Sequence, residues 1–469
     1  MSERRVLFVS PVQPIGGCSA NVYSWDKSPA RVRVAMSFLN HPGLCFLREN
    51  VPCEILEYPT RRDFEAALAT PPSVLGISFY INETEVALEM VSAARRAGVR
   101  EIWAGNYGAY SPEVVKAFDR VITGWGESQV AEALGLPPVS QTDLRHPEIY
   151  GAFGTNISSR MIFSGLLFTS RGCPWTCSFC QTPDFYGRAA QVPIETIDRI
   201  LWTYHRRGVT GINILDENFG TFSAHSTEVV NLLHRYKMRW IALTRVDTLL
   251  KHFDDWTAKG LFGAHLGIES LNQGSLSGAT KRINHLDSIR LLRKMSRLNM
   301  FVQGFYILGF PQDTTASIRE DITILSELDL DVVQVQVLTP YPRTAQRDSI
   351  EAQYGILESN LSKYNSRHLV WHHPSIQPDQ MRELQIWANT KLSSTRKALR
   401  TLAKFAVFCG RESPNLAGVK LLIDASRGPM RALQAAHARR IDGARQWARV
   451  GWYPYEEVSA GASIAGGNP

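Results

Sequence analysis

The sequence lacks any apolar run close to the roughly 20 residues that span a bilayer. The apolar stretch nearest the N-terminus, residues 6–9, is too short for an export signal. Only seven cysteines occur among 469 residues. An odd number of cysteines without an export signal argues for thiols or metal ligands rather than disulfides. We therefore expect a cytoplasmic protein.

Charge of either sign is scarce over most of the chain, whose composition of 44% hydrophobic and 20% charged residues is typical of a globular protein. The length predicts two or three domains. The net charge is +7, yet residues 391–449 alone hold 13 basic and three acidic residues. This basic segment is typical of a solvated helical face. Contact with an anionic substrate, a membrane surface or a redox partner stays open as an alternative.

Short apolar strands alternate with helical segments in the first part of the chain. The predicted strands cover residues 5–10, 53–58, 74–79 and 101–104, and residues 120–123 lead into the segment G-W-G. A helix is predicted over residues 83–97, with Gly98 as its stop signal. Alternation of this kind indicates parallel pairing, so residues 1–140 are predicted to form a doubly wound, Rossmann-like α/β domain.

A second alternation follows a Pro-, Gln- and His-containing stretch, residues 141–160, which we interpret as a linker. Its predicted strands cover residues 165–169, 211–215, 240–244, 263–267, 301–308 and 332–338. Six β/α units predict a partial (β/α)6 barrel over residues 161–350, with its site at the carboxyl ends of the strands. Residues 351–455 are predicted to be a helical basic region, and residues 456–469 a disordered tail.

Three cysteines follow the first barrel strand in the segment T-S-R-G-C-P-W-T-C-S-F-C. Cys173, Cys177 and Cys180 have the spacing C-x3-C-x2-C, which places three thiolates on one loop. A structural zinc site needs four ligands, whereas three thiolates can bind a 4Fe–4S cluster and leave one iron open. Zinc with a distant fourth ligand, and buried structural cysteines, are the alternatives.

This triad, with the aromatic Phe179 before its third cysteine, resembles the radical S-adenosylmethionine (SAM) superfamily. The resemblance implies that the open iron binds SAM. One electron from the cluster then cleaves the sulfonium C–S bond to give a 5′-deoxyadenosyl radical. It also implies an external one-electron reductant of the flavodoxin or ferredoxin type. The cofactors carry the difficult chemistry, and the protein positions them.

The resemblance continues at the ends of the later barrel strands. The segments are L-D-E-N-F, T-R-V-D, G-I-E-S and G-F-Y-I-L-G-F-P, and they supply the candidate SAM-binding residues Asp216, Glu217, Arg245, Glu269, Ser270, Gly304 and Gly309, beside Phe179. A helix-capping role for Asp216 is the alternative. The segment L-T-P-Y-P-R-T departs from the family pattern, because Arg343 stands where relatives have glycine.

A doubly wound domain before such a barrel resembles the cobalamin-binding subgroup of this superfamily. The matching segments are G-I-S, A-G-N-Y-G-A and G-W-G-E-S, which supply the candidate cobalamin-binding residues Ser78, Gly105, Asn106, Tyr107, Gly124, Gly126 and Glu127. Asn106 replaces a glycine, Trp125 replaces a glutamate, and no D-x-H-x-x-G motif is present to supply a cobalt-ligating histidine. A degenerate domain that binds nothing is the alternative.

The resemblance implies a cobalamin-dependent methyltransferase that methylates an unactivated carbon of a biosynthetic intermediate. The alternative is a cyclase, rearrangement or coupling enzyme of the same fold, acting on a small-molecule or lipid-like substrate such as an isoprenoid, with peripheral membrane contact.

Two other function classes are weighed against these enzymes. A methylthiotransferase would need an auxiliary cluster, and Cys18, Cys45 and Cys53 have the wrong spacing for one. A nucleic-acid-binding protein with a zinc loop would not explain six barrel strands that end in polar residues, so no nucleic acid is expected. A histidine cluster, His368, His372 and His373, is interpreted as surface or interface residues rather than a metal site.

Overall fold

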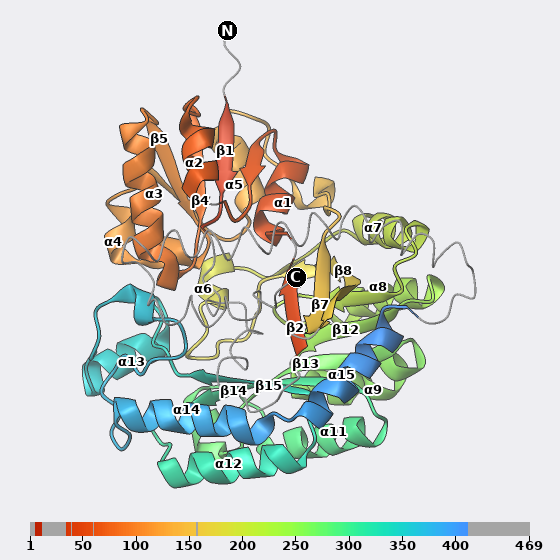
Figure 1. Ribbon diagram of the computed structural model, residues 1–469. Helices are drawn as coiled ribbons and strands as arrows, with labels where there is room; N and C mark the ends of the chain where they lie inside the picture. The colour runs from red at the N-terminus through yellow and green to blue at the C-terminus, as the bar shows by residue number, and fades with distance from the viewer. Residues whose placement is uncertain (1–4, 12–33, 39, 60, 156–157, 411–469) are drawn as a thin grey trace.

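Two large β-sheets organise the part of the chain that the computed structural model describes, residues 5–11, 34–38, 40–59, 61–155 and 158–410 (Figure 1). The first sheet is parallel and five-stranded, in the order β3-β1-β4-β5-β6. Its strands are β1 (Val6–Val9), β3 (Glu54–Leu56), β4 (Val74–Ser78), β5 (Glu101–Gly105) and β6 (Arg120–Ile122).

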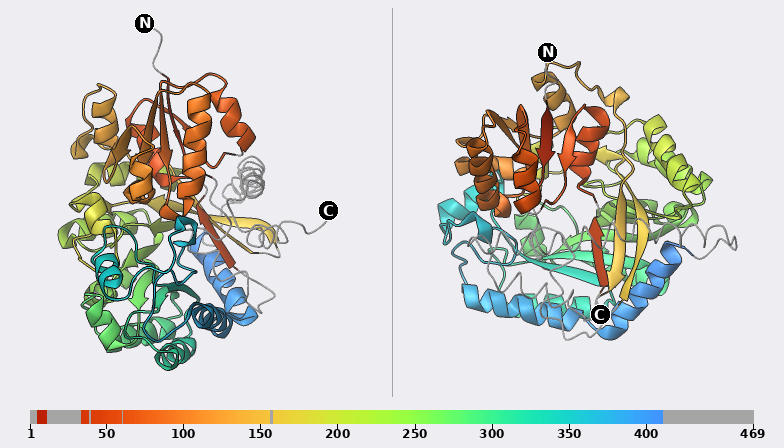
Figure 2. Two further views of the ribbon diagram at one scale, coloured as in Figure 1. Left: turned by 90° about the vertical axis from the view of Figure 1, so that its left-hand side faces the viewer. Right: turned by 45° about the horizontal axis from the view of Figure 1, so that its top comes forward.

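Helices cover both faces of this sheet, as Figure 2 shows. One face packs on α2 (Arg61–Leu68), α3 (Thr84–Arg96) and α4 (Pro112–Val115), and the other on α1 (Pro42–Asn50) and α5 (Gly126–Ala133). Strand β1 is apolar throughout because both of its faces are buried. Leu7 and Val9 pack in the core on the side of α2, α3 and α4, and Val6 and Phe8 pack in the core on the side of α1 and α5. The predicted doubly wound domain is confirmed.

The second sheet has eight strands in the order β15-β14-β13-β12-β11-β8-β7-β2. The strands are β2 (Val34–Phe38), β7 (Tyr150–Thr155), β8 (Ser158–Leu167), β11 (Gly211–Ile214), β12 (Arg239–Thr244), β13 (Leu261–Glu269), β14 (Phe301–Leu308) and β15 (Val332–Val337). From β8 to β15 the pairing is parallel, which confirms the predicted partial barrel of six strands. Strands β7 and β2 extend the sheet with antiparallel pairing.

The predicted linker over residues 141–160 is wrong, because β7 and the start of β8 lie inside it. The segment Y-G-A-F-G-T was interpreted as a loop because of its glycines and its short apolar content. Pairing with a strand on each side stabilises it as a strand despite weak local preference. Strand β2 also shows that residues 34–38 belong to the second sheet rather than to the N-terminal domain.

Amphipathic helices connect the parallel strands and cover the outer face of the barrel. They are α7 (Ile194–Arg206), α8 (Ser223–Arg235), α9 (Val246–Ala258), α11 (His285–Arg297) and α12 (Thr315–Glu327), with the shorter α10 (Gln273–Gly278) before α11 and α13 (Ala345–Gln353) after β15. Helix α12 lies beside α14 (Pro378–Leu392) at the bottom of Figure 1.

The described part of the predicted C-terminal helical region contains two helices. Helix α14 ends at Leu392, and α15 (Thr395–Phe408) begins after Ser394, whose side chain accepts a hydrogen bond from the Lys397 amide. Phe405 and Phe408 of α15 pack against Phe301 at the amino end of the barrel strands. Helix α15 therefore covers the amino end of the barrel, opposite the end at which the predicted site lies.

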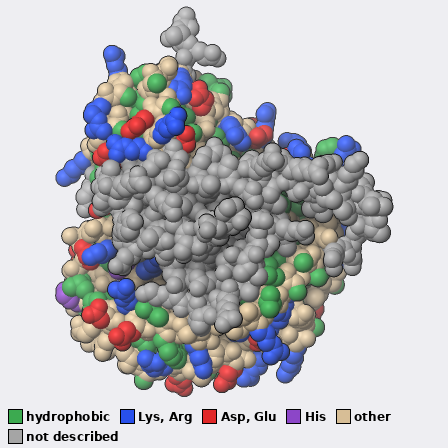
Figure 3. Space-filling model, viewed as in Figure 1, with side chains coloured by type: hydrophobic (Ala, Val, Ile, Leu, Met, Phe, Trp, Pro, Cys, Tyr) green, Lys and Arg blue, Asp and Glu red, His purple; other side chains and the backbone are tan. Residues whose placement is uncertain are grey.

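The predicted basic region and tail are described only as far as residue 410. Residues 411–469 lie outside the described residues, and most of the basic segment is among them. Figure 3 shows Lys and Arg side chains mixed with Asp and Glu around one face of the described part. Among the helices that the structure describes, none is long and apolar enough to cross a membrane.

Candidate active site

The cysteine loop lies at the carboxyl end of β8, between β9 (Ser170–Arg171) and α6 (Thr182–Tyr186). Gly172 opens the loop with φ +84°, and a Cβ there would lie 3.0 Å from the Ala189 Cα. A residue with a side chain would therefore be strained at this turn. The Ser178 amide donates to the carbonyl of Ala279 at 3.1 Å, which ties the loop to the end of α10.

Cys173, Cys177 and Cys180 line one cavity of about 340 Å³ inside the barrel mouth, as predicted. Burial raises the pKa of Cys173 to about 11 and also raises the pKa of Cys180. Both thiols therefore keep their protons at neutral pH unless a cation displaces them. Within the described ranges, no three His, Cys, Asp or Glu side chains converge closely enough to hold a metal ion.

An ion pair forms part of the opposite wall of this cluster cavity. Lys281 Nζ donates to Glu269 Oε1 at 2.8 Å, and the two side chains are 8% and 10% exposed. Burial opposes the charge of Lys281, but the Glu269 carboxylate and the nearby Cys177 together raise the Lys281 pKa. Glu269 was predicted from the G-I-E-S segment. Lys281 was missed, because no motif marks a lysine 12 residues further along the chain.

Arg245, a candidate SAM-binding residue, supplies the second cation of the cluster cavity. Its guanidinium lies 3.9 Å from the ring centroid of Trp175, in the cysteine loop. Its Nη2 donates to Asp247 Oδ2 at 3.0 Å and to the carbonyl of Lys281 at 2.9 Å. Its Nη1 is buried and has no hydrogen-bond partner among the described residues. A buried cationic donor without a partner favours an anionic group bound in this cavity.

Four predicted SAM-binding residues do not line the cavity but stabilise the segments around it: Asp216, Ser270, Gly304 and Gly309. Asp216 accepts hydrogen bonds from the Thr169 amide at 2.6 Å and the Ser170 hydroxyl at 2.7 Å, so its carboxylate holds the chain before the cysteine loop. Ser270 donates to Asp321 Oδ2 at 3.3 Å.

The two glycines among these four lie on the outer side of β14 and after its end. A Cβ at Gly304 would lie 2.7 Å from the side chains of Ile268 and Leu330, so the glycine permits close core packing. Gly309 has φ +84°, and its amide donates to Asp313 Oδ2 at 3.0 Å. Neither glycine forms part of the cavity wall described here.

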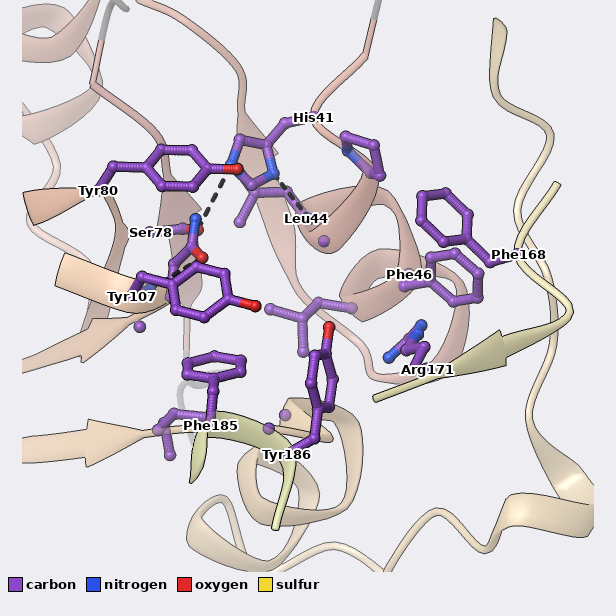
Figure 4. Close-up of a pocket in the computed structure, with 18 of the residues that line it drawn as sticks. His41, Leu44, Phe46, Ser78, Tyr80, Tyr107, Phe168, Arg171, Phe185 and Tyr186 are labelled. Atoms are coloured by element: carbon purple, nitrogen blue, oxygen red, sulfur yellow. Dashed lines mark hydrogen bonds between the residues drawn. The ribbon is translucent and has the colours of Figure 1, made fainter. Parts of the chain in front are cut away.

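A second cavity, of about 440 Å³, lies between the N-terminal sheet and the barrel. All seven residues predicted to bind cobalamin line it: Ser78, Gly105, Asn106, Tyr107, Gly124, Gly126 and Glu127. Figure 4 shows Ser78, Tyr80 and Tyr107 on one side of this interdomain cavity and Phe46, Phe168 and Arg171 on the other. The carboxyl ends of β4 and β5 form its first wall, which is where doubly wound sheets bind ligands.

The backbone at this wall explains the glycine pattern of the sequence. A Cβ at Gly105 would meet nothing closer than 3.9 Å, so the bare backbone leaves space at the strand end. Asn106 has φ +69° and ψ −174°, a conformation that glycine adopts far more readily. Its side chain accepts from the Tyr107 amide at 2.9 Å. Asn106 therefore occupies a position whose backbone favours the glycine of the family pattern.

Aromatic rings form the side of the interdomain cavity nearest the cysteine loop. The ring centroids of Tyr80 and Tyr107 are 6.3 Å apart, and those of Tyr107 and Phe185 are 4.4 Å apart. Phe185 and Tyr186 belong to α6, which directly follows the three cysteines. The segment that carries the cysteines thus also supplies one wall of the other cavity.

Three residues line both cavities: Glu217, Leu243 and Phe305. Glu217 accepts a hydrogen bond from the Gly172 amide at 2.9 Å, and burial raises its pKa to about 7. The interdomain cavity continues past these residues to His265, whose Nδ1 lies 2.8 Å from Gln303 Oε1. The two cavities therefore meet inside the barrel.

His41 also lines the interdomain cavity and was missed by the sequence analysis. Its Nδ1 accepts a hydrogen bond from the Leu44 amide at 3.3 Å at the start of α1, and its Nε2 lies 3.4 Å from the Ser78 hydroxyl. The His-Pro pair that begins α1 was the available signal. It indicates a helix start, however, rather than a ligand-binding residue.

The three histidines near residue 370 do not converge. His373 is buried, and its Nε2 lies 2.9 Å from the carbonyl of Phe310, whereas the Nδ1 of His368 lies 3.0 Å from Asn365 Oδ1. His372 is exposed. Cys45 is buried and Cys53 is half-buried, and burial raises the pKa of both thiols. Cys18 lies outside the described residues.

Comparison with known proteins identifies the class to which this site belongs. Residues 167–325 match the family model of the radical SAM superfamily, so this part of the chain is a radical SAM domain. The match begins at the end of β8 and includes the three cysteines.

The individual relatives are similar over different shares of the chain. An uncharacterized methyltransferase of Pyrococcus horikoshii is 27% identical over 49% of this chain and 50% of its own length. The bacteriochlorophyllide d C-8(2)-methyltransferase of Chlorobaculum tepidum is 24% identical over 63% of this chain and 72% of its own length.

A solved structure shows the same fold. The radical SAM methyltransferase TsrM from Kitasatospora setae, with cobalamin and a [4Fe-4S] cluster bound, has a TM-score of 0.59 and 15% identity. The similarity covers 82% of this chain and 91% of that one. At this identity the likeness concerns the fold, in which a doubly wound domain stands beside a radical SAM barrel.

Proposed function

We propose that this protein is a cobalamin-dependent radical SAM methyltransferase that methylates an unactivated carbon of a small-molecule or lipid-like biosynthetic intermediate. One observation carries the proposal. The cavity lined by the three cysteines and the cavity lined by the seven predicted cobalamin residues share Glu217, Leu243 and Phe305. Two cofactors bound there would meet at one substrate.

The donor set of the cluster cavity fits a 4Fe–4S cluster with SAM. Three thiols can hold three irons, and the fourth iron would stay open to SAM. The unpartnered Arg245 Nη1 suits the carboxylate of the methionine part, and Glu269 suits its ammonium group. Phe179 also lines the wall.

The interdomain cavity fits a corrinoid by shape and by polarity. The bare backbone of Gly105 and the aromatic rings of Tyr80 and Phe185 suit the wide, largely uncharged face of a corrin ring. Arg171 lines the same cavity, and one of its buried nitrogens has no hydrogen-bond partner in the part of the chain that the structure describes. When both groups are bound, the cluster supplies the electron that cleaves SAM and the corrinoid carries the methyl group.

The residues between the cavities have their own tasks. Leu243 and Phe305 keep water from the reacting carbon, which protects a radical from side reactions. Glu217 is the ionisable residue that both walls share, and its raised pKa of about 7 lets it hold or release a proton near neutral pH. The proposed reaction also needs an external one-electron reductant of the flavodoxin or ferredoxin type. Such reducing chemistry suits the cytoplasm.

Anaerobic reconstitution of the full chain tests the proposal. We expect about four irons and one corrinoid per chain, and both 5′-deoxyadenosine and S-adenosylhomocysteine after addition of SAM and dithionite. A variant with all three cysteines changed to alanine is the matched control. Formation of 5′-deoxyadenosine without S-adenosylhomocysteine would favour a cyclase or rearrangement enzyme. Absence of both iron and corrinoid would refute the proposal.

A further inference from the structure

Arg171 connects the cysteine loop to the N-terminal domain across the interdomain cavity. It ends β9, two residues before Cys173, and its Nη1 donates to both carboxylate oxygens of Glu127, at 2.8 and 3.0 Å. Glu127 lies in the first turn of α5. The side chains are only 9% and 5% exposed, so this is a buried ion pair between the two parts of the chain.

Two aromatic rings cover the guanidinium of Arg171. Its Cζ lies 4.0 Å from the ring centroid of Phe46 and 4.7 Å from that of Trp125. Its Nη2 is buried and has no hydrogen-bond partner among the described residues. Arg171 lines the interdomain cavity, where Figure 4 shows it beside Phe46 and Phe168. The Nη2 hydrogens are therefore donors that the surrounding protein leaves without an acceptor.

An unpartnered charged donor is costly in a buried site. Buried polar groups nearly always have a hydrogen-bond partner, because leaving one unsatisfied destabilises the folded protein. The ion pair with Glu127 and the ring contacts need only Nη1 and the guanidinium plane. Arg171 lines the interdomain cavity, so the buried and unpartnered Nη2 belongs to a side chain at the wall of a space that a ligand can fill. The missing acceptor is best supplied by the molecule that fills the cavity.

We infer that Arg171 binds the corrinoid through Nη2, which donates to a carboxamide carbonyl at the edge of the corrin ring. This inference rests on the proposed function. It assigns a cofactor contact to a residue of the radical SAM domain, outside the seven residues predicted from the N-terminal domain. Arg171 thereby links the corrinoid directly to the loop that carries the cluster cysteines.

A corrinoid offers two kinds of acceptor, and the charge balance distinguishes them. Acetamide and propionamide groups surround the corrin ring, whereas a single anionic phosphodiester lies in the nucleotide tail. Glu127 already neutralises Arg171 in a buried pair. A phosphodiester at Nη2 would bury a further negative charge without a countercharge, which is unfavourable. A neutral carboxamide carbonyl satisfies Nη2 and adds no charge.

Corrinoid binding by the full-length, anaerobically reconstituted protein tests this inference. Hydroxocobalamin and cobinamide, which lacks the nucleotide tail, are titrated while the corrinoid absorbance is followed. Removing Arg171 alone would leave Glu127 buried and unpaired, so E127Q is compared with E127Q/R171M. We expect the double variant to bind both corrinoids about tenfold or more weakly than E127Q.

A second comparison and a control complete the experiment. R171K keeps a positive charge opposite Glu127, but lysine has a single terminal nitrogen where the guanidinium has two. We therefore expect R171K to bind both corrinoids about tenfold or more weakly than the wild type. Arg120→Met is the control, because the Arg120 guanidinium also lies over a tryptophan ring, 5.5 Å from the centroid of Trp103, but is exposed and outside the cavity. Its corrinoid affinity should stay unchanged.

Each remaining outcome has a definite meaning. Equal affinities of E127Q and E127Q/R171M, or of the wild type and R171K, would overturn the inference. A loss confined to hydroxocobalamin would assign Arg171 to the phosphodiester and overturn the carboxamide contact. Failure of the wild type to bind either corrinoid would refute the cobalamin part of the proposed function itself, which is a different result from an unaffected variant.

Discussion

The two cavities of this protein are adjacent but chemically different. The cluster cavity contains the buried charges of Arg245, Lys281 and Glu269. The interdomain cavity is formed largely by aromatic rings and strand-end backbone, and its buried charges Arg171 and Glu127 neutralise each other. Charged walls suit a small molecule with several charged groups such as SAM, whereas neutral aromatic walls suit a wide uncharged ring system. Under the proposed function, this difference would let one barrel mouth keep two cofactors apart and present both to one substrate.

The largest expected effect separates the two cavities completely. Cys177→Ala removes one of three cluster ligands, so we expect iron content and SAM cleavage to fall to near zero, while corrinoid affinity stays unchanged. Iron analysis and corrinoid titration measure the two results. Cys53→Ala, which changes a half-buried thiol outside both cavities, should alter neither. Full cluster content in the Cys177 variant would contradict the cluster assignment.

A smaller effect tests the charged wall alone. Arg245→Met removes the unpartnered donor of the cluster cavity, so we expect the Kd for SAM to rise by about 30-fold, which corresponds to about 2 kcal/mol. Arg206→Met is the matched control, because that guanidinium lies 5.3 Å from the ring centroid of Trp202 on an outer helix. An unchanged Kd for SAM in the Arg245 variant would remove this residue from the binding site.

A third prediction, with an expected effect of similar size, tests the neutrality of the interdomain cavity. Burial lowers the pKa of His265 to about 4 from its usual 6.5. Between these pH values the His265 side chain binds a proton in the unfolded chain but not in the folded protein. The contribution of neutral His265 to the free energy of unfolding is therefore complete above pH 6.5 and is lost as the pH falls. Relative to His265→Gln, the wild type should lose about 2 kcal/mol of unfolding free energy between pH 7 and 4.5. Denaturant unfolding measures this, and parallel pH profiles would contradict a neutral His265.

Local signals were sufficient to predict the fold and the cysteine site. Apolar strands such as β1 and the C-x3-C-x2-C spacing depend on neighbouring residues. The strand is confirmed, and the three cysteines lie on the wall of one cavity, whereas their role as cluster ligands stays a prediction. All seven residues predicted for the interdomain cavity line it, because strand ends and glycines mark where a parallel sheet opens.

The missed features depend on contacts between segments far apart in the chain. Lys281, His41 and Arg171 carry no motif of their own, and each enters a cavity through tertiary placement. Asp216 shows the opposite case, a predicted SAM-binding residue that does not line the cavity. Its carboxylate instead accepts hydrogen bonds from the Thr169 amide and the Ser170 hydroxyl. Sequence position at a strand end identifies the edge of the sheet. It does not identify which side chains face the ligand.

Strand β2 has a consequence for any attempt to divide this protein. It comes from residues 34–38, before most of the N-terminal sheet, yet it pairs with β7 at the edge of the barrel sheet. Cutting the chain near residue 140 would take this strand away and expose the backbone donors and acceptors of β7. A radical SAM domain expressed from that point would be prone to self-association. Exchange of N-terminal domains between relatives would also have to keep strand β2 in the same chain as its own barrel.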